Sequence, residues 1–508
     1  MRSIRKKLLL SLCLLLLLPI EHITHAATTT PRVTQLSTGS GFSVVLRDDG
    51  YVWTWGINNV GQLGLGSTTY EEFPVRINGL TSVISIAASA NSVAALRSNG
   101  DVYTWGLNSS GQLGLGNTTN PIRTPTKVTG LSNIRAVYAG GGTGTGAGAR
   151  EGHMFAIDNT GAVFAWGLND MGQLGIGTSG SNVTTPRRVT ALSNIRMISV
   201  GSKFTVAVDS SGNVWQWGRI SSGNISTTPV KVAGLSNIKS VNAGMVHTVA
   251  LSNTGRVFVW GENSNGELGL GKTVTEQLVP TELTTLPTVA SVFAGRGFSH
   301  VLTSTGRAYG WGSNDDGQMA IGDNTPFLYD PTLLKNVQKM VTLSGGYVTV
   351  LATRGDNELW QWGFMGKIDD PKPADFVYIP TRIAPKRPDI KMKSMATDNK
   401  SALFTIDYKT SSLYVTKQYS FSPYGPWEAY TGEIRVDRNR TTIYARGIDG
   451  MGHVGETASL KVNNLDGLLL LPAYNTIHKN VGIVADAKEK VNTIFLVPSN
   501  FDKVANIW

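Results

Sequence analysis

The sequence contains one cysteine among its 508 residues, and this residue, Cys13, lies inside an apolar run from Leu8 to Ile20. Four basic residues precede the run, and Thr24-His25-Ala26 follows it as a small-x-small cleavage pattern. The arrangement is typical of a secretory signal peptide over residues 1–26, cut after Ala26. The remaining chain then has no cysteine and forms no disulfide. In an exported protein this absence favours a bacterial origin and a location outside the cell or in the cell wall.

A long hydrophobic run and a basic stripe are also missing. The apolar run is about thirteen residues long, whereas a spanning helix needs about 20. We therefore expect no stable membrane anchor after cleavage. Removal of four basic residues and Glu21 lowers the formal net charge from +10 to +7. No arginine-rich arm is present, which argues against nucleic-acid binding. We interpret the basic cluster at residues 386–393 as a solvated linker.

Histidines are few, seven in the chain, and they form no catalytic motif. His153 and His247 occupy a repeat position that holds phenylalanine in other copies, so we interpret both as packing residues. The glycine-rich stretch 140–148 is not followed by Gly-Lys-Ser/Thr and does not read as a phosphate loop. Acidic pairs such as Asp315-Asp316 depart from calcium-loop spacing. The sequence therefore predicts no catalytic residue, no metal site, no cofactor and no enzyme activity.

The chain does contain a repeated phrase, whose cleanest form is Gly-x-Val-aromatic-x-Trp-Gly. Successive tryptophans of this phrase are 50, 61, 51, 43, 51 and 51 residues apart. Such a period, filled with strand-like runs and glycine turns, indicates units that stack on their neighbours to bury an apolar face. We interpret these tryptophans as core residues. They are Trp55, Trp105, Trp166, Trp217, Trp260, Trp311 and Trp362.

Each copy also carries local hairpin signals. A turn dipeptide such as Asp49-Gly50 precedes the phrase, and apolar and aromatic side chains alternate after it. Most copies continue with a second glycine-rich hairpin, which is clearest from Asn108 to Gly116. A proline then precedes the next strand. The fourth and seventh copies lack the second hairpin and carry residues 219–228 and 364–379 instead.

This combination resembles the regulator of chromosome condensation repeat over residues 33–383. The resemblance implies an all-β chain and a seven-bladed β-propeller of four-stranded blades. The family's functions vary and include nucleotide exchange on a nuclear GTPase, ultraviolet sensing and β-lactamase inhibition. Export argues against nucleotide exchange, and the Gly-Trp-Arg-His-Thr pattern of the ultraviolet receptors is not found. We further expect the segment from Val33 to Leu36 to add a strand that completes the last blade.

The phrase stops near residue 384. Residues 384–466 show shorter alternating strands, and the stretch from Tyr424 to Gly452 resembles the immunoglobulin-like modules of exported bacterial proteins. We expect a small β-sandwich there, although residues 390–408 also allow half of an eighth propeller repeat. Residues 467–508 form a short tail of unassigned fold.

These features predict a secreted or cell-surface, non-catalytic binding protein that uses the propeller to hold a protein or cell-wall component. An inhibitor of a secreted or wall enzyme and a propeller-face enzyme acting on glycans remain alternatives. When the loops are aligned on their prolines, aromatic residues of copies six, seven and one fall in one sector. We expect this cluster either to bind the partner or to pack on its own turns. It comprises Tyr70, Phe73, Phe327, Tyr329, Phe376 and Tyr378.

Overall fold

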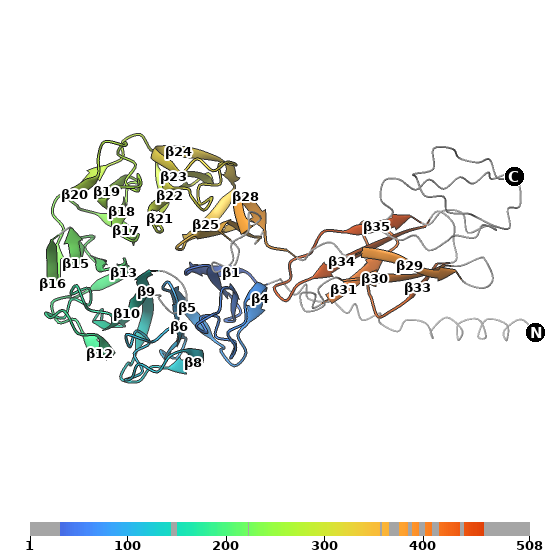
Figure 1. Cartoon of the computed structure of the whole chain (residues 1–508), viewed down its shortest axis with the longest axis horizontal. Helices are drawn as coiled ribbons and strands as arrows, with labels where there is room; N and C mark the ends of the chain where they lie inside the picture. Colours follow the sequence, from blue (N-terminus) through green and yellow to red (C-terminus); the bar gives the residue numbers. More distant parts are fainter. Residues whose placement is uncertain are drawn as a thin grey trace, which may run out of the picture.

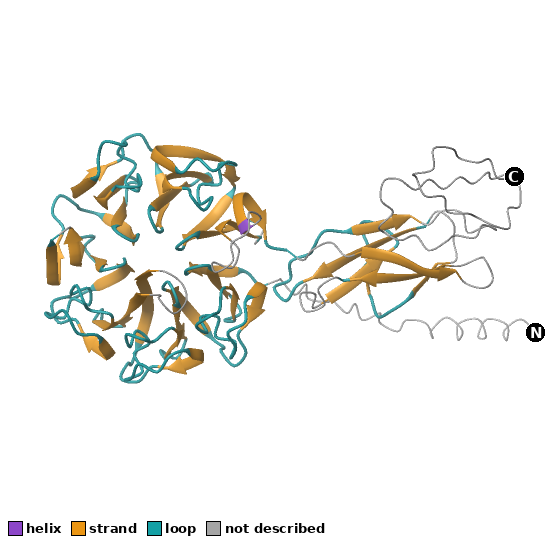
Figure 2. Ribbon diagram, in the orientation of Figure 1, coloured by secondary structure: helices purple, strands orange, loops and turns teal. Residues whose placement is uncertain are grey.

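The computed structural model describes residues 31–461, apart from 144–149, 222, 356–357, 365–374, 385–388, 396–401, 409–415 and 437–440. The expected signal peptide and the tail 467–508 lie outside the described residues. Every named element within the described part is a β-strand, and the strands are numbered β1 to β35 (Figure 2). No helix there is long and apolar enough to cross a membrane.

Strands β1 to β28 form seven four-stranded antiparallel sheets, each built from four consecutive strands, which we number sheets 1 to 7 in chain order. The sheets lie around a central opening, with the last beside the first, as in a β-propeller (Figure 1). Sheets 1 to 3 contain β1 (Val33–Thr38), β2 (Phe42–Arg47), β3 (Val52–Gly56), β4 (Glu71–Arg76), β5 (Val83–Ala88), β6 (Ser92–Arg97), β7 (Val102–Gly106), β8 (Ile122–Lys127), β9 (Ile134–Thr143), β10 (Arg150–Asp158), β11 (Val163–Gly167) and β12 (Val183–Arg188). Sheets 4 and 5 contain β13 (Ile195–Val200), β14 (Phe204–Asp209), β15 (Val214–Ser221), β16 (Asn224–Lys231), β17 (Ile238–Ala243), β18 (His247–Ser252), β19 (Val257–Glu262) and β20 (Glu276–Glu282). Sheets 6 and 7 contain β21 (Val289–Ala294), β22 (Phe298–Thr303), β23 (Arg307–Ser313), β24 (Phe327–Gln338), β25 (Met340–Gly345), β26 (Thr349–Arg354), β27 (Leu359–Phe364) and β28 (Phe376–Arg382).

The prediction that the segment from Val33 to Leu36 completes the last blade was wrong. Strand β1 pairs with β2 in sheet 1, whereas sheet 7 is complete with β25 to β28. Only three residues separate β1 from β2, so a local hairpin forms at small loop-closure cost and leaves no strand for the last sheet. The ring therefore closes by packing sheet 7 against sheet 1, without a shared strand.

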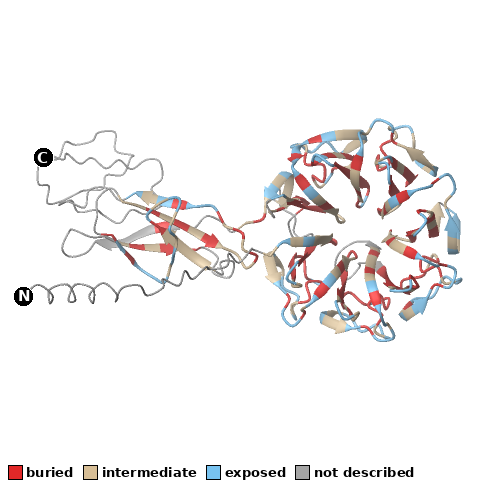
Figure 3. Ribbon diagram, turned by 180° about the vertical axis from the view of Figure 1, so that it is seen from behind, coloured by how far each residue is buried: buried red, intermediate tan, exposed pale blue. Residues whose placement is uncertain are grey.

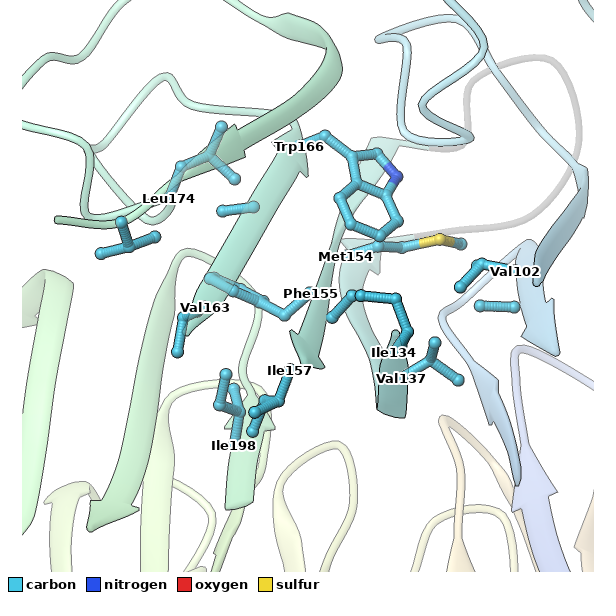
Figure 4. Close-up of a cluster of buried hydrophobic side chains, with 14 of the residues drawn as sticks. Val102, Ile134, Val137, Met154, Phe155, Ile157, Val163, Trp166, Leu174 and Ile198 are labelled. Carbon is cyan, nitrogen blue, oxygen red and sulfur yellow. The ribbon is translucent and has the colours of Figure 1, made fainter. Parts of the chain in front are cut away.

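Neighbouring sheets are held together by apolar junctions. Strand β3 alternates as expected, because Val52 packs in the junction with sheet 2 while Trp53 and Trp55 pack in the junction with sheet 7. All seven repeat tryptophans are buried, at most 4% exposed. Figure 4 shows one such cluster, in which Trp166 and Phe155 pack among aliphatic side chains from three consecutive sheets.

The repeat tryptophans also carry a polar connection between sheets. In four junctions the indole N–H donates to a backbone carbonyl in the glycine hairpin of the preceding sheet. These bonds join Trp105 to Gln62 (3.0 Å), Trp217 to Gln173 (2.8 Å), Trp311 to Glu267 (2.8 Å) and Trp362 to Gln318 (2.8 Å). Trp166 is the exception among the seven, because its indole nitrogen has no acceptor.

Sheets 4 and 7 lack the glycine hairpin, yet the tryptophans that follow them are also satisfied. Trp260 donates to the side-chain oxygen of Gln216 at 2.7 Å, and Trp55 donates to that of Gln361 at 3.2 Å. Both glutamines occupy the middle position of a Trp-Gln-Trp triplet, where the other copies carry threonine, alanine, valine or glycine. A side-chain amide thus replaces the missing backbone carbonyl.

Strands β29 to β35 form a second unit of two sheets, β29-β30-β33 and β32-β31-β34-β35 (Figure 1). Their bounds are β29 (Asp389–Met395), β30 (Ala402–Asp407), β31 (Thr416–Ser420), β32 (Glu428–Ala429), β33 (Ile434–Val436), β34 (Thr442–Ile448) and β35 (Ala458–Lys461). One core cluster joins the two sheets, including Phe404 and Ile434 from the first and Ile443 from the second. Figure 3 shows one set of buried segments within the ring and a separate set within the second unit. Residues 390–408 accordingly contribute to a sheet outside the seven of the ring.

We expect replacement of Gln216 by Met to destabilise the protein by about 1–3 kcal/mol, because the buried indole N–H of Trp260 loses its acceptor. The measurement is a double-mutant cycle with Trp260→Phe, followed by chemical denaturation. In the Trp260→Phe background the same glutamine change should cost much less. Equal costs in both backgrounds would contradict the assigned role of Gln216.

Candidate binding face

The ring has two chemically different faces. Because the four strands of a sheet are antiparallel and consecutive, the β1–β2 turn and the β3–β4 loop emerge at one end of sheet 1. The hydrogen bond from Ile57 N–H to the Gly41 carbonyl joins these two segments. We call this side of the ring, with its equivalents in the other sheets, the hairpin face. The opposite side carries the β2–β3 turns and the connections between sheets, and we call it the turn face.

The loops of the hairpin face are held by buried amide side chains. Asn58 accepts from the N–H of Leu63 at 3.0 Å and donates to the Ser67 carbonyl at 3.0 Å, while Gln62 accepts from the N–H of Val60 at 2.9 Å. The asparagine bond to the apolar residue five positions on recurs at Asn108, Asn169, Asn263 and Asn314. The five hairpins therefore form a stiff rim around this face.

The expected aromatic residues fall on this face, and all six are half-buried. Tyr329 lies against the hairpin of sheet 5, where a Cβ at Gly266 would come within 3.0 Å of its ring. Tyr378 lies in the same way against Gly317 in the hairpin of sheet 6, where the distance would be 3.1 Å. These two rings thus seal junctions between loops of neighbouring sheets.

The other aromatic residues lie nearer the loop tips. Phe327 contacts Tyr329 with ring centroids 6.0 Å apart, and Phe376 packs edge-on against Phe364 at 5.2 Å. Burial raises the pKa of Tyr70, and the negative charges of Glu72 and Asp375 raise it further. Because Tyr70 immediately precedes β4 and Asp375 immediately precedes β28, this interaction places the start of β4 near sheet 7. Sheets 6, 7 and 1 therefore carry the six aromatic residues, including Phe73 of β4, on one face, and we call this set the aromatic sector.

The innermost strands line a central cavity of about 430 Å³. Most lining residues are glycine, alanine and serine, which allow seven strand edges to approach one another. The larger side chains at the cavity include Arg296 and Tyr347. The guanidinium carbon of Arg296 lies 4.3 Å from the centre of the Tyr347 ring. Burial raises the pKa of nearby Asp316, and the charge of Asp315 raises it further.

The described histidines are packing or structural residues. His247 and Phe298 lie equally close to the glycine three residues before each of them, since a Cβ on either glycine would come within 2.2 Å of the ring. Burial lowers the pKa of His153 and His247 to about 3, and that of His300 to about 4, so all three are neutral at pH 7. Among the described residues, no three His, Cys, Asp or Glu side chains are grouped to hold a metal ion.

One hairpin residue is a buried carboxyl whose environment the sequence did not predict. Glu267 stands where four other hairpins have glutamine, is 1% exposed, and accepts from the N–H of Asn265 at 2.6 Å. Burial raises the pKa of Glu267. The signal was present in the sequence as an acid at the glutamine position, but only the structure shows that the position is sealed from water.

We expect Glu267→Gln to raise the melting temperature at pH 8, because glutamine needs no ionisation in this buried site. The raised pKa means that the folded state holds its proton to higher pH than the unfolded state does. The parent is therefore least stable, relative to the variant, above the folded pKa. The difference shrinks as pH falls from the folded pKa to the unfolded pKa and does not change further below it. Thermal unfolding from pH 4 to 8 measures this, with Gln318→Glu as the reciprocal variant. A parent as stable as Glu267→Gln at pH 8 would contradict the argument.

Comparison with known proteins agrees with this geometry. The model of the RCC1-like domain matches residues 17–286, and the regulator of chromosome condensation (RCC1) repeat matches residues 289–318. The chain belongs to the RCC1-like family. Its relatives include the ultraviolet-B receptor UVR8 of Arabidopsis thaliana, 30% identical over 349 residues, which cover 65% of this chain and 77% of the receptor. The protein pim1 of Schizosaccharomyces pombe is 29% identical over 341 residues, covering 63% of this chain and 46% of pim1.

Solved structures share the RCC1-like fold. Prp20p from Saccharomyces cerevisiae superimposes with a TM-score of 0.57 at 22% identity, covering 71% of this chain and 92% of Prp20p. Human WBSCR16 superimposes with a TM-score of 0.54 at 20% identity, covering 62% of this chain and 85% of that protein. At this identity the likeness is one of fold, and it supports the β-propeller assignment.

Proposed function

We propose that this RCC1-like protein is an exported, non-catalytic binding protein, and that the aromatic sector of the hairpin face holds its partner. The propeller is closed and seven-bladed, one blade for each four-stranded sheet, and the second unit is an immunoglobulin-like sandwich that accompanies it. The partner is a protein or a cell-wall component. The basic and apolar N-terminal segment supports export, and the absence of cysteine after residue 26 supports a bacterial source.

The observation that carries this proposal is the aromatic sector itself. Rings on three consecutive sheets, supported by a stiff rim of hydrogen-bonded hairpins, provide apolar area at little cost in conformational entropy. A related propeller, Prp20p, is described together with its binding to Gsp1p and histones, so this fold serves in that protein as a platform for other proteins. Export disfavours a nuclear GTPase as the partner of this chain.

Two other functions remain candidates. An inhibitor of a secreted or cell-wall enzyme would use the same rigid face, and the captured partner would then lose activity on binding. An enzyme acting on glycans would need exposed acid and base groups. These groups are usually a pair of carboxyl side chains, so loss of turnover on changing a single carboxylate would identify one of them. Turnover of wall glycans by the purified protein would support this last candidate.

The binding proposal is tested by changing Tyr70, Phe327 and Phe376 together to serine. We expect the triple variant to lose capture of its partner from culture supernatant or wall fractions. Its free energy of unfolding should change by only about 1–2 kcal/mol, since none of the three half-buried rings belongs to the buried core. Ile225→Ser is the matched control, because Ile225 has the same position relative to the loop proline in sheet 4 and is 47% exposed. Full capture by the folded triple variant would place the site elsewhere.

A further inference from the structure

Each chain connection from one sheet of the ring to the next supplies one apolar side chain, here called the plug, to the junction between those two sheets. In sheets 1 to 5 a buried or half-buried apolar residue directly follows the fourth strand, as Ile77 follows β4, and in sheet 6 Leu334 of β24 takes this position. Three residues further on, six copies carry another aliphatic side chain, which packs between that sheet and the next. In the first junction this residue is Leu80, which is 3% exposed and lies among Val52 and Ile77 of sheet 1 and Val83 of sheet 2. The equivalent residues are Leu131, Leu192, Leu235, Leu286 and Val337.

The junction between sheets 7 and 1 has no such residue from its own sheet. Ile383 corresponds to Ile77, and three residues later the sequence has Lys386, outside the described residues. The chain leaves the ring here, because no eighth sheet follows. A lysine cannot fill a dry junction without burying its charge.

Met451 of the second unit fills this junction instead. It is 2% exposed and lies in one cluster with Trp53 of sheet 1 and Leu359 of sheet 7. Each main member of this cluster has a counterpart around Leu80. The matching pairs are Val45 with Ala95, Trp53 with Tyr103, Trp55 with Trp105, Leu351 with Val44, Leu359 with Val52, Ile383 with Ile77, and Met451 with Leu80.

An arginine contact repeats as well. Arg97 donates from Nε to the Thr81 carbonyl at 2.9 Å, next to Leu80, and its guanidinium lies 5.9 Å from the Tyr103 ring centre. Arg47, at the same position of sheet 1, donates to the Gly450 carbonyl at 3.4 Å, next to Met451. Its guanidinium lies 5.6 Å from the ring centre of Trp53, the counterpart of Tyr103. Both arginines thus bind the loop that carries the plug.

The loop that presents Met451 is held in shape by its own hydrogen bonds. Asp449 accepts from the N–H of Met451 at 2.8 Å and from the N–H of His453 at 2.9 Å. We propose that this loop, residues 449–453, is the docking element of the second unit and acts as the missing inter-sheet loop of the ring. The ring is then complete only when the second unit is docked, and the two units are coupled in stability.

The test compares Met451→Ser with Leu80→Ser in the full chain, using hydrogen exchange resolved along the sequence. Met451→Ser should accelerate exchange at least about tenfold in β1 and in sheet 7, while the junction of sheets 1 and 2 keeps its protection. Leu80→Ser should show the reverse pattern. Tyr424→Ser, on the same unit but 94% exposed, should match the parent.

Met451→Leu provides the conservative variant, because it restores the residue type of the internal junctions. It should exchange like the parent even if Met451→Ser unfolds altogether, and that pair of results would support the proposal. Parental protection of β1 and sheet 7 in Met451→Ser would overturn it. So would a Met451→Leu variant that opens the junction as fully as serine does.

Discussion

The structure depends on a buried indole N–H that finds an acceptor in six of the seven junctions between sheets. A tryptophan is large enough to fill the space between two sheets, but its N–H becomes buried in doing so and needs an acceptor. In four junctions the glycine hairpin of the preceding sheet supplies a carbonyl, and in two a glutamine side chain does. The hairpins and the Trp-Gln-Trp triplets are therefore alternative ways to supply an acceptor. Trp166 alone among the seven makes neither bond, although sheet 2 before it carries the glycine hairpin.

Local sequence patterns predicted the strands and turns of each sheet well, because these elements form between residues that are close in the sequence. The turn dipeptides, the alternation in β3 and the period near fifty residues all describe structure within one copy. The errors and omissions concern partners far apart in the chain. Strand β1 was assigned to the last sheet, and the roles of Gln216, Gln361 and Met451 were missed. Each of these depends on which copy lies next in space, which periodicity alone does not specify.

For the aromatic residues of the candidate site, too, the sequence predicted what depends on local pattern but not the contacts made across a junction. Alignment on the loop prolines predicted that rings of sheets 6, 7 and 1 share one sector, which follows once the ring closes. The alignment did not show which rings pack against the hairpin of the preceding sheet and which do not. Tyr329 and Tyr378 lie against glycines of the preceding sheet because those glycines carry no Cβ. That distinction requires the positions of side chains across a junction. The strands of the second unit were likewise predicted from their alternating pattern, whereas the contact of Met451 and Gly450 with the ring was not.

The junction between sheets 7 and 1 differs from all the others on the turn face. On the hairpin face the preceding sheet carries no glycine hairpin, a feature that this junction shares with the junction between sheets 4 and 5. On the turn face, Met451 replaces the aliphatic residue of a chain connection that does not exist here. The difference on the turn face follows from the fact that a linear chain must enter and leave a closed ring at one of its junctions. The junction where the repeat is interrupted is free to differ in sequence, because no continuous loop has to cross it. The second unit contacts the turn face of this junction through Met451, whereas the aromatic residues proposed to hold a partner lie on the hairpin face.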